Sequence, residues 1–109
     1  MKYLIADKAS KAITVATTDC GWKRTGRTEF VDNHGDPVRV ISSAEQLRGR
    51  PKGTVVYMGP GCKDRKDWIE VMHLWETGYV ALHYPDLCPE AKKHFESKGW
   101  IAGNNPWRY

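Results

Sequence analysis

Residues 54–75, TVVYMGPGCKDRKDWIEVMHLW, hold the pattern that decides the fold. The run TVVYM is short and apolar throughout, which is typical of a parallel strand covered on both faces. A Gly-Pro-Gly turn follows it. Beyond the turn, apolar side chains recur at the spacing of one helix face, at Trp68, Val71, Met72 and Trp75. The stretch therefore predicts a buried strand, a tight turn and an amphipathic helix that ends at Gly78.

The rest of the chain offers similar elements. Apolar or β-branched runs predict strands at 3–6, 29–32, 38–41 and 79–84, with an edge strand at 100–102. The runs 29–32 and 38–41 flank a Gly/Pro turn, as in a hairpin. Helices are predicted over 8–20, over 42–47 and from Pro89 to about Lys98. The second of these helices would begin with a capping box of Ser42 and Glu45. Because residues 8–20 contain many β-branched side chains, a strand is the alternative there.

Strands and helices that alternate in this way indicate parallel β-α-β units. A chain of 109 residues has about the length of one domain. We therefore predict a single α/β domain over residues 1–109, built as a small three-layer sandwich around a mostly parallel sheet of four or five strands.

The composition of the chain predicts where in the cell the protein is located. No apolar run reaches the roughly 18 residues of a membrane span, and the first residues hold too short an apolar run for a signal peptide. Three cysteines without a C-x-x-C pair fit reduced thiols, so neither a disulfide framework nor a zinc site is predicted. We expect a cytoplasmic protein with no membrane partner, no metal and no cofactor.

The charge of the chain permits an acidic partner. The formal net charge is +4 and the pI is about 9.0. Nucleic acid is one such partner, but the basic residues are scattered along the chain, which favours an ordinary soluble surface.

Loops at one edge of the sheet are the expected place for a ligand. In an open parallel sheet, ligands bind beyond the carboxyl ends of the strands. That rule selects residues 7–10, 42–43, 59–63 and 83–86. The basic loop 48–52 leads into a strand and so belongs to the opposite edge.

The turn Gly59–Lys63 is the main ligand candidate. Its glycines allow a close approach of the backbone, and Lys63 and Arg65 would attract an anion at the start of the following helix. However, Asp64 stands where the dinucleotide pattern needs glycine, and the P-loop spacing fails as well. A purely structural turn is the favoured interpretation.

Three further side chains at this edge carry chemistry. Cys62 beside Lys63 fits either a reactive thiolate or an inert buried thiol, and the inert thiol is favoured. His83 would pair with Asp86 or Asp7 as a general base or metal ligand, or simply form a hydrogen bond. Asp7 fits either a functional acid or a helix N-cap. The candidate ligand residues are Asp7, Ser10, Gly59, Gly61, Cys62, Lys63, Arg65, His83 and Asp86. None is assigned as catalytic.

Two other features have plain alternatives. The segment 32–36, DNHGD, looks like part of a calcium loop, but the spacing fails and a turn is predicted. Aromatic residues beside loops or in the tail are candidate anchors of an interface, or platforms for unpaired bases: Trp22, Trp100, Trp107 and Tyr109. The alternative is that they seal the edges of a small core.

The order SAEQLRG, a basic loop, and then TVVYMG resembles small Rossmann-like accessory proteins encoded by bacteriophages. The resemblance covers residues 2 to 83 and is one of layout. It implies a Rossmann-like or flavodoxin-like fold and a factor that acts in the host cytoplasm by binding a host or phage component. It carries over no catalytic residue.

Three functions follow as hypotheses. The first is a non-enzymatic binding protein that uses an aromatic and basic surface to bind a protein partner or to form a homo-oligomer. The second is a nucleotide- or phosphate-ligand protein, which includes an enzyme, that uses the turn Gly59–Lys63. The third is nucleic-acid binding.

Overall fold

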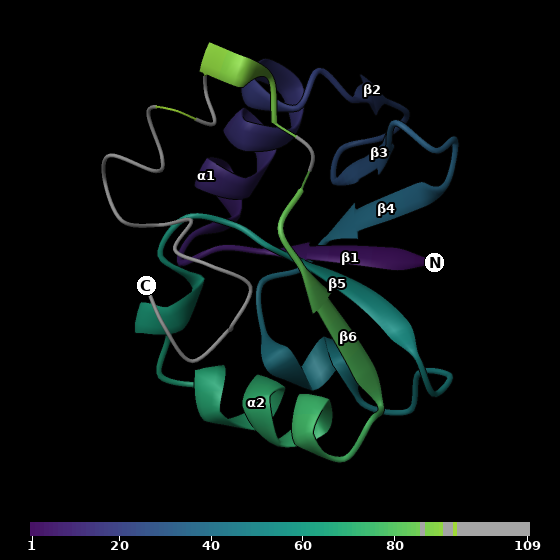
Figure 1. Ribbon diagram of the computed structural model, residues 1–109, viewed down its shortest axis with the longest axis vertical. Helices are drawn as coiled ribbons and strands as arrows, with labels where there is room; N and C mark the ends of the chain where they lie inside the picture. Colours follow the sequence, from purple (N-terminus) through teal and green to yellow (C-terminus); the bar gives the residue numbers. More distant parts are fainter. Residues whose placement is uncertain (86, 91–92, 94–109) are drawn as a thin grey trace.

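The computed structural model describes residues 1–85, 87–90 and 93. Within these residues the chain forms one six-stranded sheet with the strand order β2-β3-β4-β1-β5-β6 (Figure 1). The strands are β1 (Lys2–Ile5), β2 (Lys23–Arg24), β3 (Glu29–Val31), β4 (Pro37–Val40), β5 (Thr54–Met58) and β6 (Val80–His83). Strands β4, β1, β5 and β6 are parallel, whereas β2 and β3 extend the sheet in antiparallel fashion.

The predicted α/β class and mostly parallel sheet are confirmed. The strand number of four or five is too low, because the basic loop after Trp22 contains the two-residue strand β2. A strand this short leaves no run of residues from which to predict it. Since β2 and β3 run antiparallel, the sheet does not by itself establish a Rossmann-like sandwich.

Helical segments connect the strands. They are α1 (Ala9–Thr14), its π-helical continuation η1 (Val15–Asp19), the 3₁₀ turns η2 (Ala44–Leu47) and η3 (Cys62–Asp64), and α2 (Trp68–Glu76). Residues 8–20 are therefore helical, as predicted, and not a strand. Their β-branched threonines are accommodated because the hydroxyls of Thr14 and Thr17 donate to the carbonyls of Ser10 and Ile13, at 3.0 and 2.9 Å.

Two predicted helix caps are displaced by one residue. Lys8, not Asp7, is the N-cap of α1, and the Asp7 carboxylate instead accepts a hydrogen bond from Lys11 at 2.8 Å. At η2 the N-cap is Ser43 rather than Ser42. The reason is Gln46, whose side-chain oxygen accepts hydrogen bonds from the N–H groups of both serines, at 2.8 and 3.2 Å.

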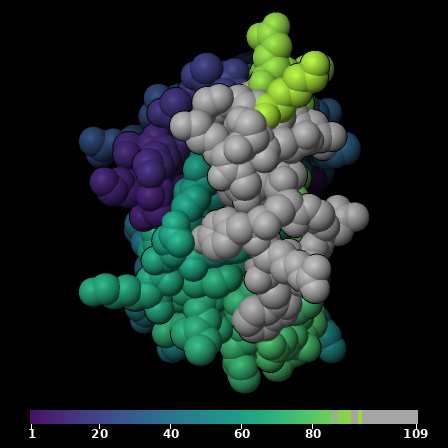
Figure 2. Space-filling view, turned by 60° about the vertical axis from the view of Figure 1, so that its left-hand side comes forward, coloured from purple at the N-terminus to yellow at the C-terminus, as the bar shows by residue number. Residues whose placement is uncertain are grey.

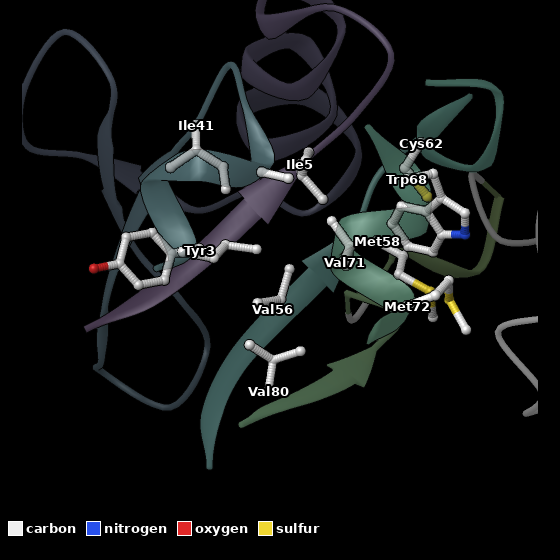
Figure 3. Close-up of a cluster of buried hydrophobic side chains, with 12 residues drawn as sticks. Tyr3, Ile5, Ile41, Val56, Met58, Cys62, Trp68, Val71, Met72 and Val80 are labelled. Atoms are coloured by element: carbon white, nitrogen blue, oxygen red, sulfur yellow. The ribbon is translucent and has the colours of Figure 1, made fainter. Parts of the chain in front are cut away.

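The sheet separates two apolar cores. Successive residues of β1 point to opposite faces, so Leu4 packs under α1 while Ile5 packs under α2. Figure 1 shows α1 and α2 on opposite sides of the sheet, each over one of the two cores. The core under α2 is shown in Figure 3, where Trp68, Val71 and Met72 of α2 belong to one cluster with Val56 and Met58 of β5.

Several predictions fall outside the described residues. They concern the edge strand at 100–102, most of the helix from Pro89, and the side chains of Asp86, Trp100, Trp107 and Tyr109. Among the residues that are described, no helix is both long and apolar enough to cross a membrane.

Candidate functional site

The carboxyl edge is the side of the sheet at which the parallel strands end. The loops after β1 and β5 meet there, as the sequence predicted. The N–H of Gly59 donates to the carbonyl of Ile5 at 2.7 Å, and the N–H of Asp7 donates to that of Pro60 at 3.0 Å. In the space-filling view, the purple start of α1 and the teal turn after β5 lie side by side (Figure 2).

The glycines of this turn are needed for contact between the loops. Gly61 has a φ of +71°, and a Cβ atom there would lie 2.7 Å from Cγ of Asp7. A Cβ atom on Gly59 would lie 2.8 Å from Cβ of Ala6. The glycines were expected to let the backbone approach a ligand closely. They instead let it approach the loop after β1, and the Asp7 carboxyl group occupies the space above Gly61.

Arg65 joins three segments at the same edge. Its Nη1 donates to the carbonyl of Ala6 at 2.9 Å, and its Nη2 donates to that of Ser42. Its Nε donates to the carboxylate of Asp67 at 2.8 Å, and that carboxylate also accepts the N–H of Ala44 at 2.8 Å. The Arg65 side chain is only 14% exposed. Its guanidinium group thus holds the ends of β1 and β4, rather than standing open to an anion.

The thiol of Cys62 is buried in the core under α2. The residue is 1% exposed, and burial raises the pKa of the thiol to about 12, despite the opposing charge of Lys63. The favoured interpretation of an unreactive thiol agrees with this placement. Burial also lowers the pKa of Lys63.

The remaining candidates do not converge on the turn. His83 is exposed at the end of β6 and pairs in register with Tyr57. It lines a cavity of about 260 Å³ on the α1 side of the sheet, together with Lys2, His34, Val55, Tyr57 and Tyr84. Residues 59–63 do not line that cavity. Ser10 is exposed on α1, where its carbonyl accepts the hydrogen bond from Thr14.

A buried polar cluster beneath His83 was not predicted. Lys2 Nζ lies 2.8 Å from the carboxylate of Asp32, and the Tyr57 hydroxyl donates to the same oxygen at 2.9 Å. The N–H groups of His34 and Asp36 donate to the other oxygen, both at 2.9 Å. Burial alone would raise the pKa of Asp32, but these hydrogen bonds outweigh it and lower the pKa to about 2. The segment DNHGD is thus a turn, as predicted, and its first aspartate holds the cluster together.

Trp22 does not lie on the surface. It is 5% exposed and packs on the Tyr57 ring, with the ring centroids 5.1 Å apart. The interface role predicted for Trp22 does not fit this placement, whereas its alternative, sealing the core, does. The sequence was misleading here because Trp22 adjoins a loop, while its side chain turns back over the sheet.

Exposed positive charge is also present at the amino edge, where the parallel strands begin. The basic loop 48–52 enters β5 there, as the sequence predicted, beside a concavity of about 460 Å³. Its lining residues are Met1, Lys2, Tyr3, Arg50, Pro51, Lys52, Gly53, Thr54 and Val55. None of these lining residues is acidic. No motif in the sequence pointed to this edge as a site.

The cations that line the concavity differ in their ion pairs and hydrogen bonds. The Lys2 ammonium group lies 2.8 and 2.9 Å from the carboxylates of Asp32 and Asp36, so its charge is already neutralised. Arg50 stacks over the Tyr3 ring at 5.5 Å and donates from Nε to the carbonyl of Gln46 at 3.1 Å. Among the described residues, the terminal nitrogens of Arg50 and the ammonium group of Lys52 have no acceptor. These two side chains therefore provide the charge that a ligand would meet.

Comparison with protein-family models, with curated proteins and with solved structures produced no match to this chain.

Proposed function

We propose that the protein is a non-enzymatic binding protein that recognises an acidic segment of a partner protein through the loop Arg48–Lys52. The proposal depends on one observation, the amino-edge concavity that Arg50 and Lys52 line without any carboxylate. Arg50, which stacks over the Tyr3 ring, and Lys52 are both able to form hydrogen-bonded ion pairs with glutamate or aspartate side chains.

The contacts of the candidate side chains at the carboxyl edge support a binding function rather than a catalytic one. Arg65 and Asp7 hold the loops of the carboxyl edge together. Cys62 is buried with a raised pKa. Each of these side chains serves the fold, whereas Arg50 and Lys52 at the amino edge have charge to offer.

An acidic polypeptide fits the surroundings of this loop better than nucleic acid does. Glu45 precedes the loop on η2, and α2, which packs against η2, carries Glu70 and Glu76. These carboxylates would repel a continuous phosphate backbone. Another exposed basic pair, Lys23 and Arg24, lies on β2 at the far end of the strand order. The charge that Arg50 and Lys52 offer is therefore confined to one short loop, which suits a short acidic segment.

The test is binding of a short labelled peptide of alternating glutamate and serine, followed by fluorescence anisotropy at low salt. We expect the double substitution Arg50→Ala and Lys52→Ala to weaken binding by about tenfold or more, because charge-assisted hydrogen bonds are lost. The matched control is Lys23→Ala with Arg27→Ala, which removes the same charge elsewhere and changes binding by about twofold at most.

Three results would contradict the proposal. The first is an equal loss in both double variants, which indicates non-specific attraction. The second is binding of a single-stranded oligonucleotide that is tighter than peptide binding and falls steeply with salt. The third is binding of inorganic phosphate without binding of the peptide.

A further inference from the structure

An apolar groove lies next to the basic loop, on the outer face of α2. It has a volume of about 280 Å³ and is lined by Arg48, Ile69, Glu70, His73 and Leu74. Ile69 is 74% exposed, although most large apolar residues of the described chain are buried. The structure therefore presents an aliphatic surface beside a cationic one.

The position of Ile69 on α2 explains its exposure. Val71 and Met72 point into the core under the sheet, so the helix is already anchored by its inner face. Ile69 and His73 are four residues apart and share the outer face. Ile69 thus contributes little to the core, and a polar residue would serve the fold equally well there.

Arg48 connects the groove to the amino-edge concavity. Its side chain lines the groove, while Arg50 and Lys52 of the same loop line the concavity. Its contact with Glu70 is 3.6 Å between two exposed groups, which is longer than a good hydrogen bond and holds the guanidinium group only loosely. Arg48 is therefore available to an acidic group that lies between the two depressions.

We infer that the partner segment carries an apolar side chain next to its acidic residues, and that this side chain docks in the α2 groove. The inference rests on the proposed function, because the loop that binds the acidic residues forms one wall of the groove. The occupant is thus an acidic segment with one aliphatic or aromatic anchor, and cation and groove are placed to bind it together.

The test compares two labelled peptides. One alternates glutamate with serine, and in the other a single central serine is replaced by leucine. We expect the leucine peptide to bind about tenfold more tightly, since it buries an aliphatic side chain. Ile69→Ser is expected to abolish this gain while it leaves the affinity for the serine peptide unchanged. Because the residue is exposed, the melting temperature is expected to stay unchanged as well.

The control is Tyr79→Ser, which removes another exposed apolar side chain beyond the end of α2 and is expected to keep the leucine gain. Equal binding of both peptides to the wild-type protein would overturn the inference, and so would a leucine gain that persists in Ile69→Ser. Self-association that Ile69→Ser abolishes would assign the groove to a second copy and would also overturn it.

The two proposals fail in different ways. Charge-dependent binding without a leucine gain contradicts only the inference about the groove. Leucine-dependent binding that survives Arg50→Ala with Lys52→Ala contradicts the proposed function.

Discussion

Asp32 accepts four hydrogen bonds that join distant parts of the chain. The donors are Lys2 at the start of β1, Tyr57 in β5, and the N–H groups of His34 and Asp36. The residue is 6% exposed, so its charge is stabilised by the protein rather than by water. We regard it as the main polar anchor on the α1 side of the sheet.

We expect Asp32→Asn to change how the free energy of unfolding depends on pH. The folded pKa of about 2 lies below the ordinary value of 3.8, so the stabilisation is complete above about pH 4 and is lost as the pH falls toward 2. Loss of the carboxylate is expected to lower the free energy of unfolding at pH 7 by about 2 kcal/mol. Stability between pH 4 and pH 2 is then expected to change less than in the wild type, as urea unfolding over a pH series would measure.

Asp36→Asn is the control for this experiment. Asp36 also contacts Lys2, but its side chain is 51% exposed, so we expect a loss below about 1 kcal/mol. If the stability of Asp32→Asn fell between pH 4 and pH 2 as steeply as that of the wild type, the account of the cluster would be contradicted.

Gly61 allows the loops after β1 and β5 to pack against each other at the carboxyl edge. We expect Gly61→Ala to lower the free energy of unfolding by roughly 2 to 4 kcal/mol, through left-handed strain and the clash with Asp7. Gly35→Ala is a matched control, because Gly35 has a φ of +80° but no atom within 4 Å of its added Cβ. Its cost should be about 1 kcal/mol, from strain alone. Equal costs in thermal unfolding would contradict the close approach.

The elements around the turn after β5 show what local sequence can predict. Strand β5, the turn and helix α2 were predicted from apolar spacing and Gly/Pro chemistry, both of which act within a few residues. The role of Arg65 was not, because its partners Ala6 and Ser42 lie far away in the chain. A basic residue after a glycine-rich turn binds either an anion or carbonyl oxygens, and only the tertiary contacts decide which.

Arg65→Ala is expected to destabilise the fold. Carbonyl oxygens at the ends of β1 and β4 would lose their donor, at a cost of about 3 kcal/mol. The neighbouring exposed Lys66 is the control, and Lys66→Ala should change the free energy of unfolding by no more than about 0.5 kcal/mol. If Arg65→Ala instead kept full stability and lost a thermal shift produced by phosphate, the anion-site hypothesis would replace the structural one.

Across the molecule, positive charge is used differently at the two edges of the sheet. At the carboxyl edge the guanidinium group of Arg65 is committed to backbone carbonyls and to Asp67, whereas at the amino edge Arg50 and Lys52 face solvent. The rule that ligands bind at carboxyl edges correctly predicted that the loops after β1, β4 and β5 meet, but His83 does not join them. It did not predict that the loops fill the space between themselves, since that depends on the Asp7 carboxyl group over Gly61.

Mapping the binding site of an acidic peptide by NMR tests this difference between the two edges most directly. On addition of the glutamate–serine peptide to the isotopically labelled protein, we predict amide shifts at Arg50, Lys52 and Gly53, with little change from Gly59 to Lys63. Shifts centred on Gly59 to Lys63 and His83 instead would contradict the account and return the site to the carboxyl edge.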